Sequence, residues 1–77
     1  MMVRIRQVSA KELIRVLERL GFKKLRQRGS HAIFEHANGR TVTVPIHPGE
    51  DLDRGLLLKI IRHDIQIGYD EFARLLR

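Results

Sequence analysis

The sequence contains no cysteine, which excludes a disulfide framework and a thiolate metal site. This absence is consistent with a reducing cytoplasm, where we expect the protein to act. No apolar run approaches the roughly 20 residues of a membrane-spanning helix, so no membrane association is expected. No long apolar segment follows the charges of Met1–Arg6, so a signal peptide is not expected there either. The 77 residues suffice for one domain, expected over residues 1–77, with a thin core.

Motifs for metals and nucleotides are also missing. No two histidines lie four residues apart on a predicted helix, and no cysteine accompanies them, so no metal site is predicted. Asp51 and Asp53 are better explained as helix caps than as metal ligands. The glycines stand singly rather than in a loop that cradles phosphate. We therefore expect no cofactor, and so short a chain favours a large partner on an open surface over an enclosed small molecule.

Positive charge is abundant and unevenly distributed. The formal net charge is +6. Residues 1–44 contain ten Lys and Arg against three Asp and Glu, whereas residues 45–77 contain five against six. A basic half beside a nearly neutral half indicates an oriented surface for a polyanion, with general solubility as the alternative.

Hydrophobic periodicity and capping signals predict a helix at the start of the chain. Ser9 and Glu12 have the spacing of a capping box, and a helical stripe of apolar residues follows them. Gly21 is expected to end this helix, with Phe22 folding back on its last turn.

Three strands and two further helices are expected after this helix. The strands are predicted at residues 23–28, 31–36 and 41–44, a second helix begins after Asp51 or Asp53, and a short last helix spans 69–76. The order is α-β-β-β-α with a short C-terminal helix, as in the double-stranded-RNA-binding fold. We expect an α+β fold in which helices cover one face of a three-stranded antiparallel sheet.

The first strand carries most of the positive charge of the sheet. If it is regular, Leu25 faces the core while Lys24, Arg26 and Arg28 form a basic row on the other side. The alternative is a solvated edge strand, because lysine and arginine also protect edges from aggregation.

The direction in which His31 faces depends on the hairpin loop at Asn38 and Gly39. A two-residue loop would pair Ile33 with Val44 on the core face and place His31 on the same side. A three-residue loop would reverse the facing, and the sequence leaves both open.

The most reactive candidate is His31, which a glycine-serine corner delivers to the start of the second strand. Histidine can take and give a proton near neutral pH, which RNA cleavage by the 2′-hydroxyl requires. A neighbouring Arg26 or Arg28 can hold the phosphate. Gly29 would allow backbone to approach backbone closely, and Ser30 can orient the imidazole or bind phosphate. The alternative is a structural histidine at a strand end.

The chain carries the following short motifs in order: Ser9-Ala10-Lys11-Glu12-Leu13-Ile14, Leu20-Gly21-Phe22, Gln27-Arg28-Gly29-Ser30-His31, Asn38-Gly39-Arg40, Val42-Thr43-Val44-Pro45, Leu52 with Arg54-Gly55-Leu56-Leu57, and Asp70-Glu71-Phe72. With these motifs the chain resembles the HicA family. This family, also described as YcfA-like, comprises the mRNA-interferase toxins of type II HicA–HicB toxin–antitoxin modules.

The resemblance implies a double-stranded-RNA-binding-like fold and metal-independent endoribonuclease activity on mRNA. It implies that His31 is catalytic, with Gly29 and Ser30 as its support. It also implies a HicB-like antitoxin that covers the active face, so we expect a monomer when free and a hetero-oligomer with the antitoxin. The basic residues predicted to bind RNA are Lys24, Arg26, Arg28 and Arg40.

The chain departs from the family pattern at two places. Gly55-Leu56 stands where relatives often have Gly-Thr, and His63-Asp64 stands where many have a glutamine and a small residue. Two other functions remain open: a non-catalytic double-stranded-RNA-binding module that uses the same basic face, and a protein-interaction domain for an acidic partner.

Overall fold

A computed structural model of the chain describes residues 6–77, so residues 1–5 of the N-terminal run considered above lie outside the described part. The elements in chain order are α1 (Ala10–Arg19), β1 (Lys23–Arg28), β2 (His31–Glu35), β3 (Thr41–Pro45), α2 (Arg54–Lys59), the π-helix η1 (Ile60–Ile65) and α3 (Tyr69–Leu75). This order confirms the predicted α+β fold. That residues 1–77 form a single domain stays a prediction.

Helix α1 begins and ends as its sequence predicts. The Ser9 hydroxyl accepts a hydrogen bond from the Glu12 N–H at 3.1 Å, and the Glu12 carboxylate accepts one from the Ser9 N–H at 3.1 Å. At the other end, the Phe22 N–H donates to the Leu17 carbonyl at 2.9 Å, past a left-handed Gly21. These bonds satisfy backbone groups that the helix itself cannot pair.

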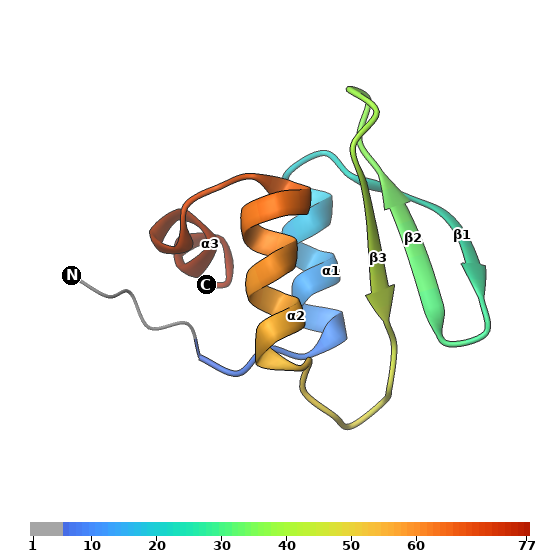
Figure 1. Ribbon diagram of the computed structural model, residues 1–77, viewed down its shortest axis with the longest axis horizontal. Coiled ribbons are helices and arrows are strands. Elements are labelled where there is room, and N and C mark those ends of the chain that lie inside the picture. The colour runs from blue at the N-terminus through green and yellow to red at the C-terminus, as the bar shows by residue number, and fades with distance from the viewer. Residues whose placement is uncertain (1–5) are drawn as a thin grey trace.

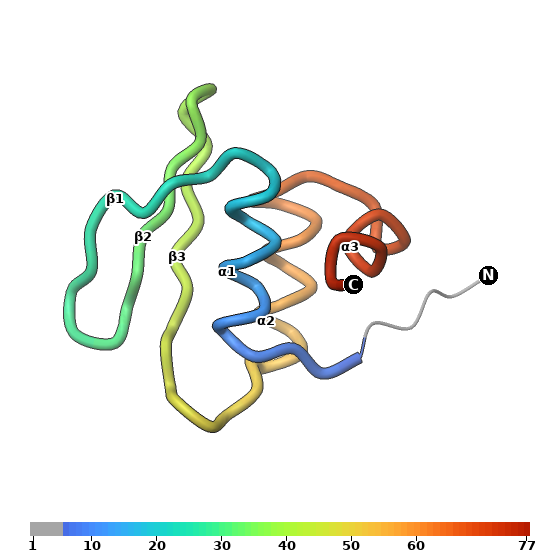
Figure 2. The backbone as a smooth tube through the Cα atoms, turned by 180° about the vertical axis from the view of Figure 1, so that it is seen from behind, coloured from blue at the N-terminus to red at the C-terminus, as the bar shows by residue number. Residues whose placement is uncertain are grey.

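The three strands form one antiparallel sheet in the order β1-β2-β3. Helices α1 and α2 lie on the same side of the strands, and β1 is the strand farthest from them (Figures 1 and 2). The buried side chains of the sheet all belong to one face, which packs against the helices; they are Ala32, Phe34, Val42 and Val44. The opposite face of β2 and β3 remains open.

The first strand differs from the prediction because it contains a bulge at Leu25. Lys24, before the bulge, pairs with a core-facing residue of β2, whereas Arg26 and Arg28, after it, pair with residues of the open face. The extra residue reverses the alternation of side chains, so the predicted row of three basic residues on one face is wrong. Leu25 itself is 54% exposed rather than in the core, since β1 lies beyond the reach of the helices.

The β2–β3 hairpin has the longer of the two loops considered above. The His36 N–H donates to the Arg40 carbonyl at 2.9 Å, which leaves three residues in the loop. Only Gly39 among them has a positive φ, +94°, as expected for a type I turn followed by a left-handed residue. Phe34 therefore lies opposite Val42 on the core face. The two-residue alternative is wrong, and His31 belongs to the open face.

The second helix changes its winding halfway along its length. Asp53 caps α2 by accepting a hydrogen bond from the Leu56 N–H at 3.1 Å. From residue 60 the chain continues as the π-helix η1, which ends at the left-handed Gln66, whose N–H reaches back five residues to Ile61 at 2.9 Å. The sequence pattern predicts a helix here but not this wider winding. Helix α3 then packs on the core through the fully buried Phe72.

Candidate functional site

The turn between β1 and β2 presents His31. Gly29 and Ser30 form a two-residue loop, in which Gly29 has φ +57° and Ser30 does not have a positive φ, the arrangement of a type II′ turn. A Cβ added at Gly29 would meet no atom within 4 Å, so the glycine is needed for its φ and not for the close approach expected above. The Ser30 carbonyl accepts a hydrogen bond from the Ile46 N–H at 2.6 Å. This bond ties the turn to the chain just after β3.

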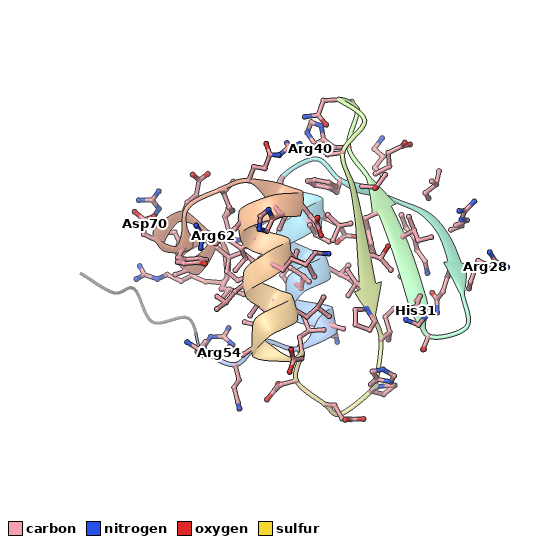
Figure 3. The ribbon with its side chains drawn as sticks, viewed as in Figure 1. Arg28, His31, Arg40, Arg54, Arg62 and Asp70 are labelled. Atoms are coloured by element: carbon pink, nitrogen blue, oxygen red, sulfur yellow. The ribbon has the colours of Figure 1, made fainter. Side chains whose placement is uncertain are left out.

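His31 lies on the open face between the other two strands. It stands opposite Arg28 of β1 and Pro45 of β3 in the register of the sheet. Directly opposed residues have Cβ atoms about 5 Å apart, so the imidazole and the Arg28 side chain are neighbours at their bases. Both side chains are exposed, with Arg28 projecting from the outer edge of the sheet and His31 nearer the helices (Figure 3). A polynucleotide can therefore reach the imidazole.

His31 lines a groove of about 360 Å³ between the sheet and the second helix. One wall is the open face of the sheet and the other is the helix formed by α2 and η1. The lining residues are His31, Thr41, Thr43, Pro45, Leu56, Lys59 and Asp64. The groove is thus lined by an imidazole, two threonines, an ammonium and a carboxylate together with the apolar side chains of Pro45 and Leu56.

The π-helical winding shapes the helical wall of this groove. Lys59 is the last residue of α2, and Asp64 follows five residues later in η1. Because a π-helix bonds residues five apart, positions with this spacing lie about one turn apart and share a face. Leu56, three residues before Lys59, completes the wall.

The residues of β1 predicted to bind RNA divide into two groups. The Lys24 ammonium donates to the Gln27 side-chain oxygen at 2.5 Å, and the Gln27 amide donates to the Gly29 carbonyl at 3.1 Å. Lys24 is therefore engaged on the core-side face of the edge strand. Arg26 and Arg28 are exposed on the open face, on the side of the sheet where His31 stands.

Arg40 lies apart from the groove and has structural contacts. Its guanidinium carbon lies 5.5 Å from the centre of the Phe22 ring, and one of its terminal nitrogens donates a hydrogen bond to the Ile65 carbonyl at the end of η1. Its Nε is buried without a partner among residues 6–77. Figure 3 shows Arg40 by the hairpin, at the opposite end of the strands from His31. The structure thus brings His31, Arg28 and Arg26 together and leaves Arg40 elsewhere.

Two further properties of residues 6–77 bear on the type of site. No three His, Asp or Glu side chains gather closely enough to hold a metal ion within that range. Nor does any helix there have the length and apolar character to cross a membrane.

Comparison with protein-family models assigns the chain to a family. The family model described as the HicA toxin of bacterial toxin–antitoxin systems matches residues 10–65, which is more than half of the chain. The chain belongs to the HicA toxin family. A search of curated proteins gives no significant match. Family membership supports a toxin role and implies, in general terms, an antitoxin partner and an RNA target.

The match in this HicA chain covers every residue of the groove. It runs from the start of α1 to the end of η1 and includes the Gly29-Ser30-His31 turn. Sequence reasoning found His31 but missed Lys59, Thr43 and Asp64. Leu56 and Lys59 are spaced to share a helix face, but no local signal shows that this face meets β3.

Proposed function

We propose that this HicA chain is a metal-independent endoribonuclease that cleaves mRNA, with His31 as an acid–base catalyst. The observation that carries the proposal is the exposed position of His31 in a groove, beside Arg28 on the open face of the sheet. Membership of a family known for mRNA interferases supports it. The proposal takes the chain as one domain, monomeric when free and active in the cytoplasm.

The proposed reaction is an attack of a ribose 2′-hydroxyl on the adjacent phosphorus. The hydroxyl loses its proton to a base, the P–O2′ bond forms, and the P–O5′ bond breaks as the 5′-oxygen gains a proton. The products are a 2′,3′-cyclic phosphate and a free 5′-hydroxyl. His31 can serve as the base or as the acid, since histidine exchanges protons near neutral pH.

Arg28 is proposed to hold a phosphate beside the imidazole. Its position opposite His31 in the sheet gives the two side chains a common face. The planar guanidinium can donate two parallel hydrogen bonds to phosphate oxygens, which fixes orientation as well as charge. Arg26, two residues earlier on the same face of the sheet, can contact a neighbouring part of the RNA strand.

The toxin is proposed to be neutralised by a HicB-like antitoxin. A partner that covers the open face would block both His31 and the arginines of β1 at once. A partner bound to the helical side of the molecule, away from the open face, would cover neither His31 nor these arginines.

The decisive experiment compares RNA cleavage by the wild type, His31→Ala and His63→Ala. His63 is exposed on η1 and does not line the groove, so it is the matched control. We expect His31→Ala to lower the cleavage rate by about 10²–10⁴-fold, the usual contribution of general acid–base catalysis, with a matching loss of growth arrest in cells. His63→Ala and added EDTA should leave cleavage unchanged, and a 2′-deoxy substitution at the cleaved nucleotide should abolish it. A folded His31→Ala protein with undiminished activity would remove His31 from the mechanism.

The competing function is a non-catalytic double-stranded-RNA-binding module. The exposed Arg26 and Arg28 on the open face favour RNA binding whether or not cleavage follows. In that case His31→Ala would leave both binding and toxicity unchanged, and the wild type would release no cyclic phosphate.

A further inference from the structure

The proposed function uses only one side of His31. Arg28 stands beside His31 on the side of β1, with Arg26 two residues away on the same face, whereas the other side is the helical wall of the groove. Lys59 is the cationic residue on that wall. An RNA strand that enters the groove at His31 would therefore contact the helical wall as well.

Lys59 and Asp64 are available to a ligand. Within residues 6–77, neither the Lys59 ammonium nor the Asp64 carboxylate makes a hydrogen bond or an ion pair with another group. Lys59 is exposed and Asp64 is half-buried, and both line the groove. The π-helix brings these opposite charges onto one wall, although a regular α-helix would turn Asp64 away from Lys59.

We propose that this groove binds one nucleotide of single-stranded RNA, with a phosphate on Lys59 and the edge of the base facing Asp64. The assignment rests on the proposed function, because His31 then marks where the reacting phosphate lies. The groove volume of about 360 Å³ is near the lower end for small-ligand sites, roughly 300–1,000 Å³, and suits one nucleotide.

The charges of the wall fix the direction of the nucleotide. An ammonium attracts phosphate and a carboxylate repels it, so the phosphate lies toward Lys59 and away from Asp64. The Asp64 carboxylate accepts hydrogen bonds, and the amino groups of cytosine, adenine and guanine donate them. Uracil has no amino group and presents a carbonyl oxygen in its place. The subsite therefore favours a base that carries an amino group over uracil.

The Lys59 contact is tested by binding of short 2′-O-methyl oligo(C), which cannot be cleaved. Lys59→Gln is compared with Arg62→Gln, which removes the same charge from the same helix but on the side of α3 (Figure 3). We expect Lys59→Gln to weaken binding about tenfold, as for the removal of one charge-assisted hydrogen bond. It should also reduce the slope of log affinity against log salt by about 0.7, the value for one phosphate contact to a single strand. Lys59→Arg should restore most of the binding.

The Asp64 contact is tested by comparing oligo(C) with oligo(U). The wild type should bind oligo(C) more tightly, and Asp64→Asn should shrink this preference by strengthening the binding of oligo(U). Asp70→Asn, a matched loss of charge on α3 far from the groove, should leave the preference unchanged (Figure 3).

These experiments distinguish a failure of the groove assignment from a failure of the proposed function. Equal effects of Lys59→Gln and Arg62→Gln on binding and on its salt dependence would overturn the groove assignment, even if His31→Ala abolishes cleavage. Equal binding of oligo(C) and oligo(U) by the wild type would overturn the base-facing role of Asp64. Conversely, loss of binding in Lys59→Gln alongside normal cleavage by His31→Ala would keep the groove and reject His31 as the catalyst.

Discussion

Arg28 and Arg40 are the same residue type in opposite surroundings. Arg28 is exposed at the edge strand, opposite His31. Arg40 is half-buried against Phe22 and donates to the Ile65 carbonyl, so it joins the hairpin to the end of η1. Arg28 directly precedes a glycine-containing turn and Arg40 directly follows one, so the neighbouring sequence does not show which arginine is exposed. Their different roles follow from what the fold places next to each one.

Substituting these two arginines by methionine should separate stability from RNA binding. Arg40→Met removes the donor to Ile65 and should lower the free energy of unfolding by about 1–3 kcal/mol. Arg28→Met removes a side chain that is exposed at the sheet edge, so we expect a change within roughly 0.5 kcal/mol, together with weaker RNA binding. Urea denaturation and RNA titration of both variants check this. Equal losses of RNA affinity in two folded proteins would instead assign Arg40 to the RNA surface, as the sequence suggested.

At the scale of elements, the capping box of α1 makes stability depend on pH. The Arg6 guanidinium donates to the Glu12 carboxylate at 2.7 and 3.2 Å, and the Ser9 N–H donates a further bond. These bonds lower the pKa of Glu12 from its ordinary 4.5 to about 2, with the Arg6 bond as the largest cause. A depressed carboxyl pKa stabilises the folded state above the unfolded value, and this contribution is lost as the pH falls toward 2.

Glu12→Gln should therefore flatten the acid side of the stability curve. The glutamine oxygen still accepts the Ser9 N–H, so the helix remains capped while the titration disappears. We expect the variant to be less stable than the wild type at neutral pH and the two curves to converge near pH 2, measured by urea denaturation across that range. Because Glu12 is partly exposed, solvent and salt reduce the effect. Parallel curves would show that the Arg6–Glu12 pair contributes nothing measurable.

Ser9→Ala tests the other half of the same box. It removes the hydroxyl that accepts the Glu12 N–H and should cost about 1 kcal/mol of stability, the usual value for removal of an N-cap. Unlike Glu12→Gln, it should shift the stability curve down with little change of its acid slope. A steep change of slope in Ser9→Ala would indicate that the hydroxyl, and not Arg6, controls the carboxyl.

The elements themselves were predictable because their signals are local. Ser9, Glu12 and Gly21 fix the ends of α1 within a few residues of sequence, and the strands follow from alternation and turn residues. The facing of side chains was not predictable, since one residue more or less in a loop or strand reverses it. The third residue of the loop at Gly39 and the extra residue of the bulge at Leu25 each reverse the facing in this way. The groove needed both facings and the winding of η1, so only His31 could be found beforehand.

At the scale of the whole molecule, the open face of the sheet carries the exposed Arg26 and Arg28. The part of the chain up to residue 44 carries the excess charge, and its exposed arginines on β1 lie at the edge farthest from the helices (Figure 1). The double variant Arg26→Gln with Arg28→Gln should therefore weaken RNA binding. It should also reduce the slope of log affinity against log salt by roughly 0.7 for each phosphate contact to a single strand that is lost. Lys11→Gln with Arg15→Gln, at two exposed positions of α1, removes equal charge and should leave the slope unchanged. A similar slope for both double variants would indicate attraction by net charge alone.

The same distribution predicts where the antitoxin binds. A partner that neutralises the toxin by exclusion must cover the open face, so amide hydrogen exchange should slow in β1, in β2 and along the α2 wall of the groove when the cognate antitoxin is added. The exposed residues of α1 and α3, which do not line the groove, should exchange as in the free chain. A non-cleavable RNA should compete with the antitoxin for this surface. Lys59→Gln should reduce this competition by RNA more than Arg62→Gln does. Protection confined to α1 and α3, with no competition, would mean that the antitoxin acts at a distance and that the open face is not its binding surface.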